Sequence, residues 1–170
     1  MLPNDDPRRA MTVARSETDA RLPHVAVVGD VYTILVSGEQ TAGRYALIDM
    51  FVPPGGGPPP HRHDFEEMFH VLEGEVEVLF RGAKSTAGVG ATVNVPANAP
   101  HAFKNVADKP ARLLCMVSPA GEEQFFLEIG DRVATRTGPL PVLDEEARGE
   151  RAAKAKRLAP KYKNEILAPQ

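Results

Sequence analysis

Three histidines and one glutamate stand at spacings that suit a metal site. His61 and His63 are two positions apart, Glu67 follows four positions later, and His101 lies further along the chain. Side chains two positions apart on a strand point to the same face, so His61 and His63 can bind one ion, and Glu67 keeps their parity. Three imidazole nitrogens and one carboxylate oxygen suit a divalent ion of Fe, Mn, Ni, Co, Cu or Zn. Four protein ligands would leave two positions of an octahedral ion open.

The residues around these four decide the interpretation, because two histidines on a strand are more often solvated or hydrogen-bonded than bound to metal. A first block, residues 55–74, begins and ends on glycine and encloses the first three candidate ligands. A second block, residues 90–105, places Pro96 and Asn98 shortly before His101. The two blocks resemble the two motifs of the cupin superfamily, and the resemblance extends over roughly residues 43–118.

The resemblance implies a small antiparallel jelly-roll β-barrel with a metal ion inside. It carries the family's metal ligands over to His61, His63, Glu67 and His101. The family usually has glycine at the position of Asn98, and asparagine is the other residue that best tolerates a left-handed backbone. A narrower resemblance is to the quercetin 2,3-dioxygenase-like group of small cupins, on residues 52–61, 66–74, 118–126 and 161–167.

The composition is that of an ordinary folded protein with many turns. The chain has 170 residues, 42% of them hydrophobic and 25% charged, with 14 glycines and 16 prolines. With a net charge of −3, the chain lacks the excess of positive charge that would attract it to nucleic acid or to an anionic membrane surface. No apolar run is long enough to span a membrane. Cys115 is the single cysteine, which excludes an intrachain disulfide and fits a cytoplasmic protein. We interpret Cys115 as a small buried side chain rather than a reactive thiol.

We expect an all-β fold in three regions, namely an N-terminal arm at 1–22, a β-barrel at 23–130 and a helical extension at 131–170. Helices are predicted at 122–129 and at 144–158, where Asp144 is a plausible N-cap. Two pairs of neighbouring strands are predicted, 68–72 with 76–80 and 101–103 with 111–117. Further strands are predicted at 25–28, 31–36, 44–53 and 92–95.

Four aromatic side chains are candidates for a substrate pocket. Phe69 and Phe103 share the parity of the ligands on their strands, and Tyr45 and Phe51 lie on the preceding strand. For each of them, a role as an ordinary residue of the hydrophobic core is at least as good an explanation. The same parity argument places Lys104 outside, which favours an apolar pocket of the kind that small molecules occupy.

The leading functional hypothesis is a metal-dependent dioxygenase, an oxidoreductase acting on a small phenolic or enolisable substrate. The resemblance implies that Glu67 is catalytic as well as a ligand, because in dioxygenase-like cupins this glutamate is thought to accept the substrate proton. One alternative is a non-catalytic, metal-dependent small-molecule binding or sensor cupin, and another is a zinc-type isomerase. Redox-capable ions favour oxygen chemistry and zinc argues against it. We expect a homodimer, because exposed strand edges need cover.

Overall fold

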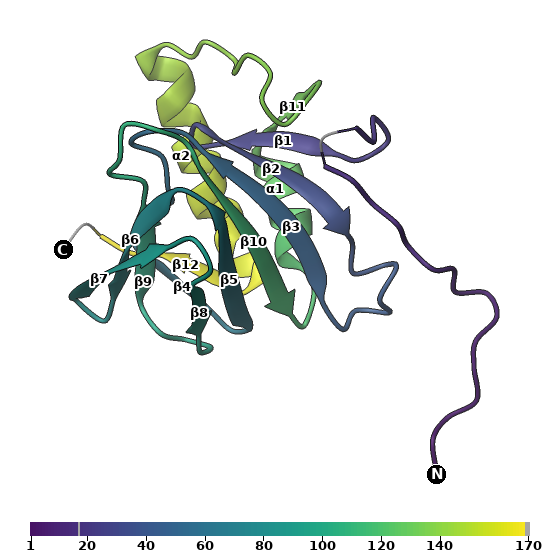
Figure 1. The fold of residues 1–170 in the computed structure, drawn as a ribbon. Helices are drawn as coiled ribbons and strands as arrows, with labels where there is room; N and C mark the ends of the chain where they lie inside the picture. The colour runs from purple at the N-terminus through teal and green to yellow at the C-terminus, as the bar shows by residue number, and fades with distance from the viewer. Residues whose placement is uncertain (17, 169–170) are drawn as a thin grey trace.

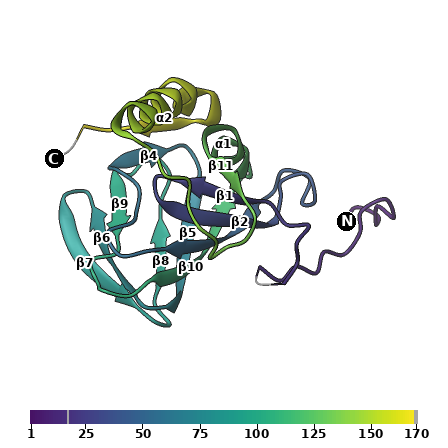
Figure 2. The same ribbon diagram turned by 90° about the horizontal axis from the view of Figure 1, so that it is seen from above.

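The computed structural model describes residues 1–16 and 18–168, and its strands form two antiparallel sheets around a shared interior (Figures 1 and 2). One sheet has seven strands, in the spatial order β11 (Asp131–Val133), β1 (His24–Val27), β2 (Asp30–Val36), β3 (Ala46–Val52), β10 (Ala111–Ser118), β5 (Glu66–Glu73) and β8 (Thr92–Val95). The other has five, in the order β12 (Asn164–Ile166), β4 (His61–His63), β9 (His101–Lys104), β6 (Glu75–Phe80) and β7 (Ala83–Gly88). The two sheets are not closed into one continuous barrel.

The core between the sheets is formed by side chains that alternate along the strands between buried and more exposed positions. Along β10 and β5 every second residue is buried, as a sheet with one inward face requires. Ile48, Leu113 and Val117 of the larger sheet are fully buried, and Val76 and Phe103 of the smaller sheet face them across the interior core. The all-β fold with short C-terminal helices is therefore confirmed.

The two predicted strand pairs are wrong. β5 pairs with β10 and β8, whereas β6 pairs with β7 and β9, so the turn at Gly74 passes the chain from one sheet to the other. Gly74 has φ 70°, and a Cβ there would lie 2.8 Å from the carbonyl oxygen of Pro110. β9 and β10 also lie in different sheets. Alternation of apolar and polar residues predicts that a segment is a strand, but it does not predict which strand the segment pairs with.

Two helices and a C-terminal strand lie beside the strands that carry the candidate metal ligands. The helices α1 (Glu122–Ile129) and α2 (Glu145–Leu158) pack together near β1 and β4, as Figure 2 shows. Asp144 caps α2 by accepting a hydrogen bond from the backbone N–H of Ala147, as predicted. The turn η1 (Ala159–Tyr162) then leads into β12, which pairs with β4.

The residues outside the two blocks of the sequence also join the sheets. β11 and β12 come from the segment assigned to the helical extension, and the division into arm, barrel and extension stays a prediction. The first residues run away from the sheets in Figure 1, and Ser16 then donates a hydrogen bond to buried Asp49 of β3 at 2.5 Å. No helix among the described residues has the length and apolar character to span a bilayer.

Candidate metal centre

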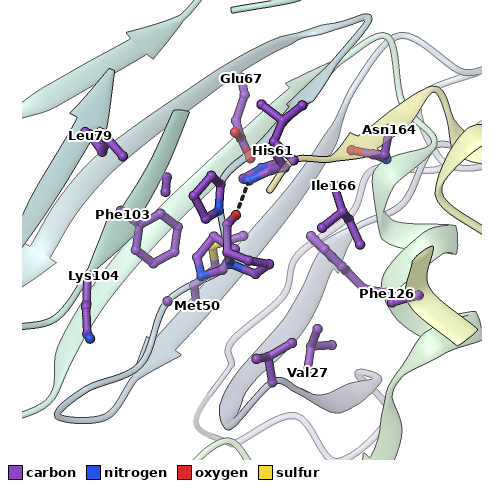
Figure 3. A pocket seen from close by; sticks show the side chains of 18 of the residues that line it. Val27, Met50, His61, Glu67, Leu79, Phe103, Lys104, Phe126, Asn164 and Ile166 are labelled. Carbon is purple, nitrogen blue, oxygen red and sulfur yellow. Dashed lines mark hydrogen bonds between the residues drawn. The ribbon is translucent and has the colours of Figure 1, made fainter. Parts of the chain in front are cut away.

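The four candidate ligands come together between the two sheets. His61 and His63 lie on β4, and His101 lies on β9 directly opposite His61 in the strand register. Glu67 reaches them from β5 of the other sheet. One ligand atom from each of the four residues lies within 4.8 Å of the others, and His63, Glu67 and His101 are buried. Figure 3 shows His61 and Glu67 side by side at the cavity wall.

Backbone carbonyl groups fix the orientation of all three imidazole rings. A carbonyl oxygen only accepts, so each Nδ1 that lies against one carries the proton and donates it. Each Nε2 is then left to face the cluster, and in the neutral ring this atom carries the lone pair that binds a metal ion. The three contacts are Nδ1 of His61 with the oxygen of Pro59 at 2.9 Å, of His63 with Phe65 at 3.0 Å and of His101 with Ala99 at 2.9 Å.

The contact between His101 and Ala99 follows a residue with left-handed backbone, Asn98. Asn98 has φ 67°, the conformation that glycine adopts most easily and that asparagine tolerates. The next residue, Ala99, provides the carbonyl that orients His101. Asparagine at this position is thus compatible with the loop geometry that the site needs.

The charges of the cluster suit a cation. Glu67 Oε2 lies 3.0 Å from Nε2 of His63 and 3.0 Å from Nε2 of His101. Burial raises the pKa of Glu67, but the hydrogen bonds with His101 and His63 outweigh burial and hold that pKa below its usual value. Burial, together with nearby His101, lowers the pKa of His61 to about 4, so His61 is neutral at pH 7. Three imidazole nitrogens and one carboxylate that converge on one point fit a borderline divalent ion.

Cys115 contacts the Glu67 carboxylate at the oxygen that does not face the histidines. Its Sγ lies 3.4 Å from Glu67 Oε1, and the side chain is fully buried on β10. Burial raises the pKa of Cys115 well above its usual value, and the nearby Glu67 adds to the effect. The thiol therefore keeps its proton and donates to Oε1, while Oε2 faces the histidines. Such a contact orients a ligand without binding the ion itself.

A cavity of about 840 Å³ opens beside the cluster, and most of its walls are apolar (Figure 3). Phe69 and Phe103 line the cavity together with His61 and Glu67, in agreement with the parity of their strands. Their ring centroids are 5.2 Å apart at 72°, an edge-to-face arrangement.

Tyr45 and Phe51 lie outside this cavity, in contrast to the expectation from sequence. Met50 on β3 lines the cavity, and because neighbours on a strand point to opposite faces, Phe51 points away from it. The guanidinium carbon of Arg136 lies 6.0 Å from the centre of the Phe51 ring. Tyr45 precedes β3 and is 39% exposed.

Sequence reasoning missed a second polar group in the cavity. Glu122 and Asn164 line the wall, and both are buried. Asn164 Nδ2 donates to Glu122 Oε2 at 2.6 Å. Burial raises the pKa of Glu122 to about 8, although the hydrogen bond with Asn164 acts against this rise. The apolar spacing of α1 was visible in the sequence, but it did not show that the helix would turn Glu122 inward.

Other residues of the cavity wall come from α1 and from the end of β9. Phe125, Phe126 and Ile129 of α1 line the cavity as well as packing against the core. Lys104 contributes to the lining, although parity had placed it outside. The side chain of Lys104 lies at the end of β9, below Phe103 in the view of Figure 3.

Comparisons with known proteins agree with this fold. Residues 48–117, which include all four candidate ligands, match the Cupin domain family model. An uncharacterized protein of Methanocaldococcus jannaschii is 26% identical over 111 residues, which are 64% of this chain and 89% of that protein.

Two solved structures show the same architecture. An RmlC-like cupin from Shewanella frigidimarina is 18% identical with a TM-score of 0.53, and the match covers 67% of this chain and 99% of that one. The polyketide cyclase RemF from Streptomyces resistomycificus is 21% identical with a TM-score of 0.50, and the match covers 88% and 92%. These findings show the cupin fold and support the cupin superfamily.

Proposed function

We propose that this cupin is a metal-dependent dioxygenase of the quercetin 2,3-dioxygenase-like group, acting on a small phenolic or enolisable substrate. The observation that carries the proposal is the cluster of three imidazoles and one carboxylate beside a mostly apolar cavity. Apolar walls with few polar atoms are typical of sites for small organic molecules. The implied ion is one of Fe, Mn, Ni, Co or Cu.

Different residues of the cavity serve substrate binding and proton transfer. Phe69 and Phe103 offer apolar surface against which a planar ring can pack. Glu67 faces the cavity, where its carboxylate is placed to take the proton of a substrate hydroxyl group. When bound, the ion would act as a Lewis acid on that hydroxyl and supply the redox chemistry that zinc lacks. The buried walls keep water from competing with the substrate.

The ligand assignment is tested by metal content. His63→Ala and His101→Ala should each purify with little bound metal, because each removes one of four ligands. His70→Ala is the matched control, since His70 lies on β5 beside the site but contacts Thr92 at 2.9 Å on the other face. A full metal complement in either ligand variant would disprove the assignment.

The alternatives are separated by the same preparation. Oxygen consumption with 3-hydroxyflavone or a simple phenol, lost when Glu67 is replaced by glutamine, would support the dioxygenase. Stoichiometric zinc together with tight ligand binding and no oxygen consumption would instead favour a binding or sensor cupin. Conversion of a substrate by the zinc form without oxygen would favour an isomerase.

We also propose that the chain forms a homodimer. The N-terminal arm exposes Met1, Leu2, Met11 and Val13, and such apolar side chains suit a partner surface. Light scattering should give a dimer mass for the full chain and a smaller mass for a variant lacking residues 1–22. Monomer mass for both would disprove the proposal.

A cytoplasmic location is proposed on the single, buried Cys115. Cell fractionation tests this proposal, and recovery of the protein outside the cytoplasm would disprove it.

A further inference from the structure

We propose that Glu122 and Asn164 form a second recognition point of the cavity, which binds an uncharged oxygen atom of the ligand. The ligand class is a planar aromatic molecule with two oxygen substituents, one facing the four-residue cluster and one facing this pair. This inference rests on the proposed function only for the aromatic nature of the ligand, and its test needs no turnover.

The first argument is the placement of the pair. Asn164 lies on β12 directly opposite His63 of β4 in the strand register, and both side chains are buried. Neighbouring strands are about 4.8 Å apart, so Asn164 lies one strand away from the metal ligands. Figure 3 shows Asn164 at the cavity wall near His61, on the side of Ile166 and Phe126. A small aromatic molecule can therefore reach the pair and the cluster at once.

The second argument is that the pair has unused hydrogen-bonding capacity. Asn164 Nδ2 donates to Glu122 Oε2 at 2.6 Å and also approaches the carbonyl oxygen of Tyr162 at 3.1 Å. Among the described residues, neither Glu122 Oε1 nor Asn164 Oδ1 has a hydrogen-bond partner. Glu122 is only 5% exposed and, like Asn164, lines the cavity, so a ligand held there can reach these two oxygens. A ligand oxygen in the cavity would supply the missing partner.

The third argument concerns the kind of oxygen that fits. No cation forms a salt bridge with Glu122 among the described residues, and burial favours its uncharged form. Because Oε2 accepts from Asn164, the proton of the neutral acid belongs on Oε1, where it can be donated to the ligand. Asn164 Oδ1 offers an acceptor beside it. One donor next to one acceptor suits a hydroxyl or carbonyl group of the ligand better than a cation.

The fourth argument is the contrast with the rest of the lining. Phe125, Phe126 and Ile129 of α1 present apolar surface around the pair. Glu77, another carboxylate of the lining, is already paired with Lys84 at 2.8 Å and is partly exposed. Glu122 is thus the carboxyl group whose replacement should change ligand selection, and Glu77 is the matched control.

The experiment compares ligands with one and two oxygens on the same ring system. Binding of 2-naphthol, 1,3-dihydroxynaphthalene and 2,3-dihydroxynaphthalene to the zinc-loaded protein is followed by ligand fluorescence without oxygen. At least one dihydroxy compound should bind about tenfold more tightly than 2-naphthol to the natural protein. Glu122→Leu should remove that preference while leaving 2-naphthol affinity and zinc content unchanged.

Three further variants separate recognition from structure. Glu122→Gln, which keeps a donor and an acceptor, and Glu77→Leu should both retain the preference. Glu122→Met, whose length is closer to that of glutamate, is measured beside the leucine variant and should behave like it. An equal ratio of affinities in the natural protein and in the leucine and methionine variants would overturn the proposal, as would no preference in the natural protein. Glu122-dependent binding without any oxygen consumption would leave the recognition point standing and contradict the dioxygenase alone.

Discussion

The Sγ atom of Cys115 lies 3.4 Å from Oε1 of Glu67 and supports the one anionic residue of the cluster from the neighbouring strand of the same sheet. A thiol is a weak donor, but this contact is fully buried, and the orientation of a ligand by a neighbouring group commonly affects metal affinity.

Cys115→Val should therefore weaken metal binding, by roughly tenfold, without emptying the site. Valine fills a similar volume but offers no proton to Oε1. Cys115→Ser keeps a donor and should bind metal more tightly than the valine variant does. Competition with a chelator of known affinity measures the difference, and equal metal affinities for the valine variant and the natural protein would show that the contact has no effect.

The loop before His61 should be sensitive to substitution at one glycine and tolerant at another. Gly57 has φ 122°, and a Cβ there would collide with the backbone carbonyl of Phe103. Gly55 has φ 79°, with open space around the position of a Cβ. Gly55→Ala should lower the free energy of unfolding by about 1–2 kcal/mol through backbone strain alone, and Gly57→Ala should cost more than that. Urea unfolding of the two variants checks the order, and an equal or smaller loss for Gly57→Ala would contradict the packing described for this loop.

Asp30 should make stability depend on pH. It is buried on β2, where its Oδ1 accepts from the backbone N–H of Gly57 at 3.2 Å and its Oδ2 accepts from the Tyr32 hydroxyl at 3.1 Å. Burial raises the pKa of Asp30 to about 7 from an ordinary value of 3.8, although the two hydrogen bonds act against the rise. Between these two values the folded protein holds a proton that the unfolded chain has lost. The contribution to stability is thus complete below the ordinary pKa, and it is lost as pH rises through the folded pKa.

Asp30→Asn should remove this dependence, because asparagine stays uncharged throughout. Relative to the natural protein, the variant should gain stability as pH rises from about 4 to about 7.5, by an amount on the order of a few kcal/mol. Unfolding by urea at several pH values, in one buffer with chelator, measures the difference between the two proteins. A difference that stays constant over this range would show that Asp30 is ionised in the folded protein.

Much of the site followed from local pattern. Parity along β5 placed Glu67, Phe69 and Val71 on one face, and all three are buried. The left-handed backbone at Asn98 also agrees with the residue type found there. These features depend on the two-residue repeat of a strand and on backbone sterics, which act over a few neighbouring residues.

The features that sequence did not predict depend on contacts between distant segments. β12 lies about a hundred residues after β4 in the chain, yet it places Asn164 beside His63. The turn at Gly74 was visible, but its passage between sheets depends on which strands compete for each edge. The direction of Glu122 depends on how α1 packs against the sheet, which its helical period alone does not determine.

The central claim is best tested by measuring metal content and oxygen consumption on one preparation purified without added metal or chelator. We predict about one redox-capable ion per chain and oxygen consumption with 3-hydroxyflavone or a member of a small panel of phenols and diketones. Glu67→Gln should abolish the consumption, and His70→Ala should leave it unchanged. Stoichiometric zinc, or no consumption after loading with each of Fe, Mn, Ni, Co and Cu, would contradict a dioxygenase.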